Sequence, residues 1–288
     1  NMQRLEPVLF QLRSGQCRMG LWRSEDENFC KELLPFNTRE ITSVCADGKN
    51  VWFGTRSGIV ARGSEGDFKR CDRPSGVPFN RISSLTIDES SGRTWYSCSP
   101  GWGLGFYTSE EKVKHYGPMS EESFPTWAGA LHLSTVHGLL IGSDEGKGAD
   151  SIYAYKDGSL TEYLVGDSAV SAIADAGDVV YVGTNRGLLR LRHGKIEAVE
   201  ETKYLPCKVI TCLRVAKDRT LWIGTEGAGV GRYDGKVLQV IAVPGGLLNN
   251  VISLCYSPSG IEFRPLAADG SLARWTACSG VAACRRPA

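Results

Sequence analysis

The sequence predicts an all-β protein: a seven-bladed β-propeller of four-stranded blades, with the last blade closed by both chain termini. Two observations lead to this fold class. A run of β-branched and aromatic residues with a small residue near its end returns about every 40 to 45 residues, which is the period of a four-stranded propeller blade. A second short run precedes most copies and carries Ser, Thr or Gly at its second position.

The first of these runs is expected to be the second strand of each blade. Its composition favours a strand, and the small residue indicates the turn that follows. Neighbouring blades cover both faces of such a strand, so no polar alternation is expected along it. The clear copies are Val51–Thr55, Thr94–Cys98, Leu139–Ser143, Val180–Thr184 and Leu221–Thr225, and the weaker ones are Val8–Leu12 and Ile261–Pro265.

The other run is expected to be the first, innermost strand. We attribute the small residue at its second position to the lack of space where inner strands converge on a propeller axis. Turn-forming residues such as Asp47-Gly48 and Lys217-Asp218 follow it. First strands are expected to begin at Ile41, Ile82, Ala128, Val170, Ile210 and Ile252. Third strands are expected near Ile59–Arg62, Gly105–Tyr107, Ile152–Tyr155, Leu188–Leu191, Val230–Tyr233 and Leu272–Trp275.

The two chain ends decide the number of blades. The segment before Ile41 supplies three strands but lacks a first strand, and the tail Val281–Cys284 fits that place. We therefore expect one domain, residues 1–288, in which residues 1–40 and 281–288 share the closing blade and leave no exposed sheet edge. The alternative is six blades with an N-terminal arm.

Composition limits the partners. The 33 basic and 32 acidic residues give a net charge of +1, so neither nucleic acid nor an anionic membrane is an expected partner. No apolar run reaches the roughly 18 residues that a membrane span needs. We expect a soluble monomer, with an intracellular location favoured over secretion.

The best copy of the repeat resembles a known family. Residues Leu221–Asp234 (Leu-Trp-Ile-Gly-Thr-Glu-Gly-Ala-Gly-Val-Gly-Arg-Tyr-Asp) resemble the two-component-regulator propeller repeat, and Gly245–Ser253 and Gly76–Ser83 resemble its beginning. The resemblance covers nearly the whole chain. It implies a propeller that serves as the sensor or ligand-recognition part of larger signalling proteins.

The chain is more distantly similar to streptogramin-inactivating lyases, which are also seven-bladed propellers. The similarity lies in the second strand. Their Trp-Phe-Thr-Glu ending reads Trp52-Phe53-Gly54-Thr55 here, so the carboxylate is missing. Their active site of a metal and a histidine has no evident counterpart in this sequence.

No sharp catalytic motif is present. The chain has no phosphate-binding Gly loop, no Gly-x-Ser-x-Gly and no His-Glu-x-x-His. His132 and His137 fall on a strand and on the turn after it, so they would point in different directions. We expect no metal site and no cofactor.

The ten cysteines form no Cys-x-x-Cys pair, which argues against a zinc ribbon or a redox motif. Many fall on expected strands, where Cys behaves as a small hydrophobe, so reduced core thiols are expected. The alternative is a disulfide that joins Cys278 or Cys284 to Cys17 or Cys30.

A ligand is expected on one face. In propellers, the loops between second and third strands and those between blades share one face around a central funnel. Arg and Trp are enriched at binding hot spots, and both residue types fall in these loops. The predicted ligand-binding residues are Arg39, Arg56, Arg81, Trp102, Trp127, Arg186, Lys208, Glu226 and Asn250.

The leading hypothesis is a non-enzymatic recognition module that binds a protein or a small molecule on this face. The alternative is a lyase-type or isomerase-type enzyme in which a carboxylate abstracts a proton beside an arginine. A sugar-binding protein is a third hypothesis, motivated by the two tryptophans. A catalytic carboxylate should be buried in the funnel, whereas a recognition face leaves it solvated. The candidate catalytic residues are Glu226, Asp144 and Glu145, with Arg56 or Arg186 as the arginine.

Overall fold

The computed structural model describes residues 41–47, 49–63, 65–69, 81–98, 101–108, 112–120, 124–143 and 150–241, together with the backbone of the strands outside these ranges. The chain divides into two compact units, Asn1–Leu133 and Ser134–Ala288. Secondary structure in the described residues is almost entirely β, as predicted, with one 3-10 helix, η2 (Glu200–Tyr204).

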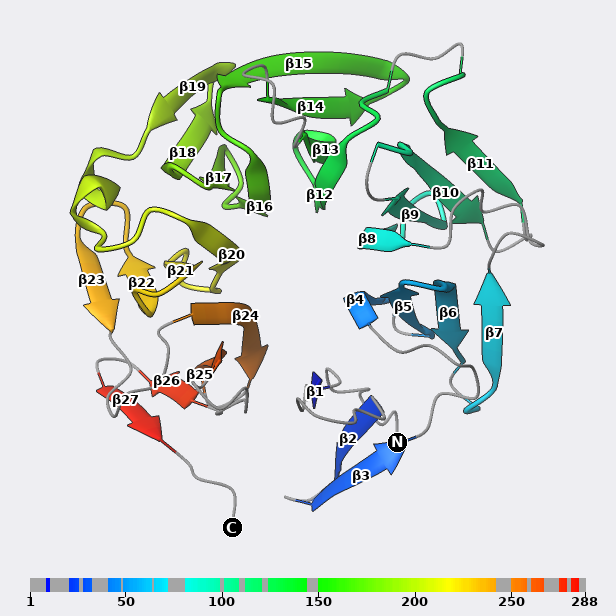
Figure 1. Ribbon diagram of the computed structural model, residues 1–288, viewed down its shortest axis with the longest axis horizontal. Helices are drawn as coiled ribbons and strands as arrows, with labels where there is room; N and C mark the ends of the chain where they lie inside the picture. Colours follow the sequence, from blue (N-terminus) through cyan, green and yellow to red (C-terminus); the bar gives the residue numbers. More distant parts are fainter. Residues whose placement is uncertain are drawn as a thin grey trace. The chain divides into compact units, whose positions relative to one another are not determined.

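Each blade is a four-stranded sheet in which every strand pairs with the next along the chain (Figure 1). In the first unit the blades contain β4 (Ile41–Ala46), β5 (Val51–Thr55), β6 (Gly58–Arg62) and β7 (Phe68–Cys71), then β8 (Ile82–Asp88), β9 (Arg93–Cys98), β10 (Leu104–Thr108) and β11 (Val113–Tyr116). The next sheet contains β12 (Ala128–Ser134), in which the unit boundary falls, β13 (Gly138–Ser143), β14 (Asp150–Lys156) and β15 (Ser159–Gly166). The second unit continues with β16 (Val170–Asp175), β17 (Val179–Thr184), β18 (Gly187–Arg192) and β19 (Lys195–Ala198), then β20 (Ile210–Val215), β21 (Leu221–Thr225), β22 (Val230–Tyr233) and β23 (Leu238–Ile241).

The predicted count of seven four-stranded blades, closed by both termini, is wrong. The structure describes five such blades with their side chains, and the sheets at the two chain ends are separate. The N-terminal sheet has three strands, β1 (Leu9–Phe10), β2 (Leu21–Glu25) and β3 (Asn28–Glu32). The C-terminal sheet contains β24 (Asn250–Ser257), β25 (Gly260–Leu266), β26 (Trp275–Cys278) and β27 (Val281–Cys284).

The C-terminal strand is the reason for this difference. β27 pairs with β26, and Cys278 lies opposite Val281 in the register. A hairpin between adjacent segments closes a very short loop, whereas pairing with the N-terminal sheet would join segments far apart in the sequence. The tail therefore completes its own blade as the fourth strand.

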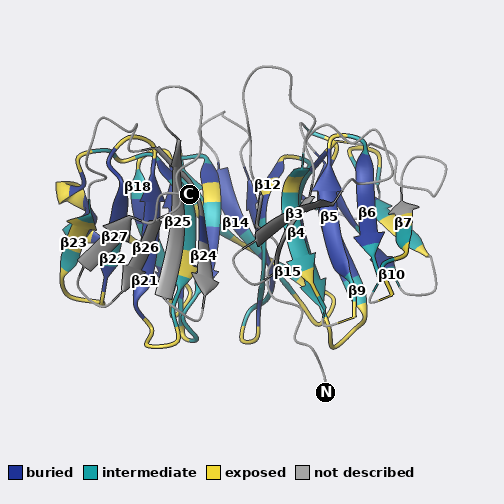
Figure 2. Ribbon diagram, turned by 90° about the horizontal axis from the view of Figure 1, so that it is seen from below, coloured by how far each residue is buried: buried dark blue, intermediate teal, exposed yellow. Residues whose placement is uncertain are grey.

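The predicted second strands are confirmed at β5, β9, β13, β17 and β21. Every residue of β5 and of β21 is buried, and Figure 2 shows β5 in the dark blue of buried residues. The core lies between consecutive blades. In the first unit, Trp52 and Ile59 of one blade pack in one cluster with Ile82 and Tyr96 of the next.

A glycine near the end of the second strand makes room for the following blade. A Cβ at Gly54 would lie 2.8 Å from Cγ2 of Ile82, and a Cβ at Gly183 would lie 2.6 Å from Cγ2 of Ile210. Gly142 faces Val170 in the same way. The first residue of each of these first strands thus packs directly on the backbone of the preceding blade.

The small residues at the second position of the first strands were expected from lack of space near the propeller axis. The structure gives a different reason. Thr42 and Ser171 are exposed, so lack of space does not explain them. Their hydroxyls donate hydrogen bonds to the next blade: Thr42 Oγ1 to the carbonyl of Ile82 and Ser171 Oγ to that of Ile210, both at 2.6 Å. These side chains connect consecutive inner strands.

Replacing Ser171 by Ala should lower the free energy of unfolding by about 1 kcal/mol, because the carbonyl of Ile210 loses this donor. Urea denaturation measures the change. Ser159→Ala, at an exposed position of β15, is the control and should change stability little. Equal effects of the two substitutions would contradict a bridging role for Ser171.

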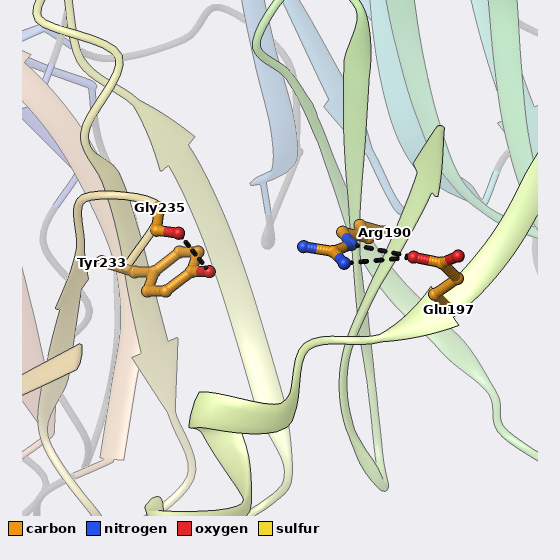
Figure 3. Close-up of polar contacts among 4 residues, drawn as sticks. All are labelled: Arg190, Glu197, Tyr233 and Gly235. Carbon is orange, nitrogen blue, oxygen red and sulfur yellow. Dashed lines mark hydrogen bonds and ion pairs between the residues drawn. The ribbon is translucent and has the colours of Figure 1, made fainter. Parts of the chain in front are cut away.

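An aspartate also holds the turn after β22. Oδ1 of Asp234 accepts the N–H groups of Lys236 and Val237 at 2.9 and 2.8 Å, and these bonds lower the pKa of the Asp234 carboxyl. The Tyr233 hydroxyl donates to the carbonyl of Gly235 at 2.9 Å and closes the same turn (Figure 3). Local side-chain bonds of this kind hold a turn without help from the core.

The outer strands are tied by exposed ion pairs. Arg190 of β18 lies 3.1 Å from the carboxylate of Glu197 on β19 (Figure 3). Both side chains are open to solvent, so the pair contributes little to stability. The stability of the blades comes instead from the buried second and third strands.

Candidate functional site

Two kinds of loop meet at the same end of each blade. The N–H of Asn185, after β17, donates to the carbonyl of Ala169, which precedes β16. The N–H of Glu226, after β21, donates at 2.9 Å to the carbonyl of Val209, which precedes β20. The turn between second and third strands and the segment that enters the first strand therefore share one end of the blade, here called the loop end.

The predicted site residues fall into two groups. Arg56, Arg81, Trp102 and Trp127 belong to the first unit, and Arg186, Lys208 and Glu226 to the second. A single funnel lined by both groups stays a prediction. Arg39, Asp144, Glu145 and the side chain of Asn250 lie outside the described residues.

In the first unit, the two tryptophans come together. A Cβ at Gly101 would lie 3.1 Å from Cε2 of Trp127, so the Trp127 indole packs against the residue that precedes Trp102. The N–H of Gly103 donates to the carbonyl of Thr126 at 2.7 Å, which joins the two loop segments. Both indoles remain open to solvent, with 42% of Trp102 and 38% of Trp127 exposed.

This loop needs its glycines. Gly101 and Gly103 have φ angles of 71° and 80°, in the left-handed region that other residues rarely adopt. A Cβ at Gly103 would also collide with the carbonyl oxygen of Tyr116. The described backbone at residues 101–103 thus brings the segment that carries Trp102 against the segment that carries Trp127.

A histidine that the sequence did not single out contacts this loop. Nε2 of His115, on β11, lies 2.7 Å from the carbonyl oxygen of Trp102. Its Nδ1 lies 3.3 Å from the hydroxyl of Tyr96, and the two rings stack with centroids 5.9 Å apart. Burial lowers the pKa of His115, against the opposing effect of the bond to Trp102. Its partners lie 13 and 19 residues away in the sequence, so no local pattern indicates the cluster.

In the second unit, Arg186 pairs with a carboxylate that sequence reasoning missed. Its guanidinium lies 2.5 Å from Oδ2 of Asp167, in the segment before β16. Both side chains are about 60% exposed. Asp167 follows Gly166 in the loop that enters the blade, and that position could have suggested it.

Glu226 does not occupy the position expected of a catalytic base. Its side chain is exposed on the turn after β21. The nearby thiol of Cys207 lies 2.8 Å from the backbone carbonyl of Glu226 rather than near its carboxylate. The burial that a catalytic carboxylate requires is therefore not found at this residue.

A threonine at the end of the second strand holds the turn that carries these residues. Oγ1 of Thr225 donates to the carbonyl of Gly229 at 2.8 Å and accepts the N–H of Ala228 at 3.1 Å. Oγ1 of Thr184 makes the equivalent bonds, to the carbonyl of Gly187 and from the N–H of Arg186. The repeat thus fixes the backbone from which the loop-end residues project.

Within the described residues, no cluster of three or more His, Cys, Asp or Glu side chains could hold a metal ion. The described cysteines Cys45, Cys98, Cys207 and Cys212 are not joined in disulfides, and burial raises the pKa of Cys45 and of Cys212 to about 12. A thiol with a raised pKa stays protonated at neutral pH and is a weak nucleophile. The disulfide alternative concerns Cys17, Cys30, Cys278 and Cys284, whose side chains lie outside the described residues.

The part of the chain that the structure describes contains no helix with the length and apolar character of a membrane span.

Comparisons with known proteins support the predicted resemblance. The family model for the two component regulator propeller matches residues 204–227, which include β21. No curated protein matches the chain. The match therefore rests on one copy of the repeat.

Solved structures agree on the fold. Virginiamycin B lyase from Staphylococcus aureus is 17% identical with a TM-score of 0.64, over 83% of this chain and 85% of its own. The extracellular domain of the BT3049 hybrid two component system from B. thetaiotaomicron is 18% identical with a TM-score of 0.68, over 92% of this chain and 39% of its own. The β-propeller domain of Cps50 (Swd1) from Myceliophteria thermophila is 14% identical with a TM-score of 0.59, over 84% of this chain and 85% of its own.

These identities establish the fold and nothing finer, and the chain spans about two-fifths of the length of the B. thetaiotaomicron protein. The chain is a β-propeller in which residues 204–227 match the model of the two component regulator propeller.

Proposed function

We propose that this chain is a recognition module, which binds a protein segment or a small molecule at the loop end of its blades and catalyses no reaction. The observation that supports this most is that two exposed indoles, Trp102 and Trp127, lie on two loop segments that contact each other through Gly101 and Gly103. Trp is among the residues most enriched in binding hot spots. A ligand with a flat apolar face would remove both rings from water.

The positions of the charged residues favour recognition over catalysis. A general base needs burial or a charged partner that adjusts its pKa to its task. Glu226 is exposed, and Arg186 pairs with Asp167, itself well exposed. The match to two component regulator propellers is a further reason to propose a sensing role.

A thermal-shift screen of the purified chain tests this function, because a ligand that binds only the folded state raises the melting temperature. The panel contains metals, sugars, nucleotides, small carboxylic acids and a peptide library. We expect Trp102→Ala and Trp127→Ala each to weaken binding of a hit by about 30-fold, or about 2 kcal/mol, as at other hot spots. Tyr204→Ala is the control, since this 75% exposed ring belongs to η2 in the other unit.

Three results would contradict the proposal. One is a panel without any hit. Another is a hit whose affinity changes no more in the two tryptophan variants than in Tyr204→Ala. The third is conversion of a hit into a product, which would establish an enzyme instead.

A further inference from the structure

We propose that the Tyr96–His115 pair positions Trp102, so that presentation of this indole depends on His115 remaining neutral. The inference rests on the recognition function proposed for Trp102 and Trp127, and it adds regulation by pH to that site. It comes from the contacts of one ring, which touches the recognition loop on one side and the blade core on the other.

The hydrogen bonds define the tautomer of His115. A carbonyl oxygen only accepts, so the 2.7 Å contact with Trp102 requires the hydrogen on Nε2. Nδ1 of the neutral ring is then an acceptor, and the Tyr96 hydroxyl, 3.3 Å away, donates to it. The chain of bonds runs from the core through His115 to the backbone of Trp102.

Packing in the core holds Tyr96, the first member of this series of hydrogen bonds, in place. Tyr96 is completely buried, and its hydroxyl lies where a Cβ at Gly105 would otherwise stand. Gly105 of β10 is also the residue opposite His115 in the sheet register. The glycine therefore leaves the space in which the Tyr96 hydroxyl meets the imidazole.

The groups that face His115 come from three elements. Tyr96 of β9 is the titratable one, and desolvation raises its pKa, with a smaller contribution from Cys98. β10 presents Gly105, and the loop presents the carbonyl of Trp102. On β11 itself, the Lys114 ammonium lies over the ring of Tyr116, 4.9 Å from its centroid. Burial lowers the pKa of His115, the bond to the Trp102 carbonyl opposes this shift, and no charged side chain among the described residues contributes to it.

Protonation would disturb this arrangement at Nδ1. The nitrogen would become a donor and face a hydroxyl that is now also a donor. The hydrogen of the fully buried Tyr96 hydroxyl would have to turn away from Nδ1, and the half-buried imidazolium would lose part of its hydration. Movement of the ring toward solvent relieves both costs, and it removes the donor from the Trp102 carbonyl.

Lowering the pH is expected to break the contact between His115 and the Trp102 carbonyl and to lower the stability of the fold. The pKa of His115 in the folded protein lies below its usual value of 6.5, so the ring is neutral and the contact intact above pH 6.5. As the pH falls below 6.5, the unfolded chain binds a proton first, and folding loses stability. The contact itself is lost only when the pH passes through the lowered pKa.

19F NMR of the full chain labelled with 5-fluorotryptophan tests the proposal without any ligand. The seven tryptophans give seven resonances, and Trp102→Phe assigns that of Trp102 by its disappearance. In a titration across pH 6.5, we expect the Trp102 resonance to shift with a midpoint below 6.5. The resonance of Trp222, buried in β21 of the other unit, should stay in place and report that the fold persists.

Two variants make the outcome decisive. His115→Gln keeps an N–H donor and cannot titrate, so the Trp102 resonance should lose its pH-dependent shift. His115→Phe keeps a ring against Tyr96 without a donor, so Trp102 should be displaced at every pH. A Trp102 resonance that does not move with pH in the native chain, or that moves equally in His115→Gln, overturns the proposal. Because no ligand is used, this result is independent of the screen for the recognition function.

Discussion

Replacing Gly183 by Ala is expected to lower the free energy of unfolding by about 2 to 3 kcal/mol, at the upper end of overpacking effects. The added methyl would lie 2.6 Å from Cγ2 of Ile210 and 3.3 Å from its Cβ. Both neighbouring atoms sit next to the backbone of the following blade, so they cannot rotate away as the end of a long side chain could. The two blades must therefore separate.

Gly231→Ala is the matched control. Gly231 is also a buried strand glycine of the second unit, but a Cβ there would lie 3.4 Å from Cβ of Ile223, an ordinary contact. Urea denaturation of both variants measures the difference. If Gly231→Ala destabilises the chain as much as Gly183→Ala does, the interblade contact is not the cause.

At one contact between blades, the chain itself combines a larger residue at the glycine position with a smaller residue at the start of the next first strand. In β9 the equivalent position is Ser97 instead of Gly, and the next first strand begins with Ala128 instead of Ile or Val. The Ser83 hydroxyl lies 2.7 Å from Oγ of Ser97 and 3.4 Å from the carbonyl oxygen of Ala128, so these residues meet. A larger residue on one blade is thus paired with a smaller one on the next.

The same combination of a larger and a smaller residue, introduced at Gly183 and Ile210, gives the Gly183 prediction a second test. Ile210→Ala alone should cost about 2 to 5 kcal/mol because it empties a buried site. The double variant Gly183→Ala, Ile210→Ala should be more stable than the sum of the two losses predicts, since the new methyl enters the vacated space. Strict additivity would mean that the two residues do not share that space.

The regular part of the fold could be predicted because each copy of the repeat carries its own signals. Val51–Thr55 and Leu221–Thr225 were assigned from residue type alone, and both are entirely buried strands. Asp47 was expected in a turn, and its carboxylate accepts the N–H groups of Lys49 and Asn50. Strand preference and turn chemistry act over a few residues, so they can be read from a short segment.

The features that could not be predicted depend on distant partners. The pairing of β27 with β26 reflects competition between two possible neighbours, and sequence periodicity does not measure that competition. The role of Thr42 follows from its hydrogen bond to the carbonyl of Ile82 in the next blade, 40 residues away, and no local pattern in the sequence indicates that bond. The two tryptophans were correctly suspected of lying in loops, but their proximity depends on the loop backbone at Gly101 and on His115.

Replacing Thr225 by Val is expected to cost about 2 kcal/mol, because a buried donor is left without its acceptor. Val has nearly the same shape, so the buried site stays filled. The N–H of Ala228, a residue only 6% exposed, loses the Oγ1 acceptor, and the carbonyl of Gly229 keeps only the longer bond from the backbone N–H of Thr225. Guanidinium denaturation measures the loss.

Thr225→Ser separates the hydroxyl from the methyl. Ser keeps both hydrogen bonds and loses one methyl group, so its cost should be clearly below that of Val. If Ser proves as damaging as Val, then packing of the methyl, and not the hydroxyl, holds this turn. In that case the threonine that ends β17 and β21 would be a packing residue, and the backbone under Arg186 and Glu226 would depend on the neighbouring blade rather than on the repeat itself.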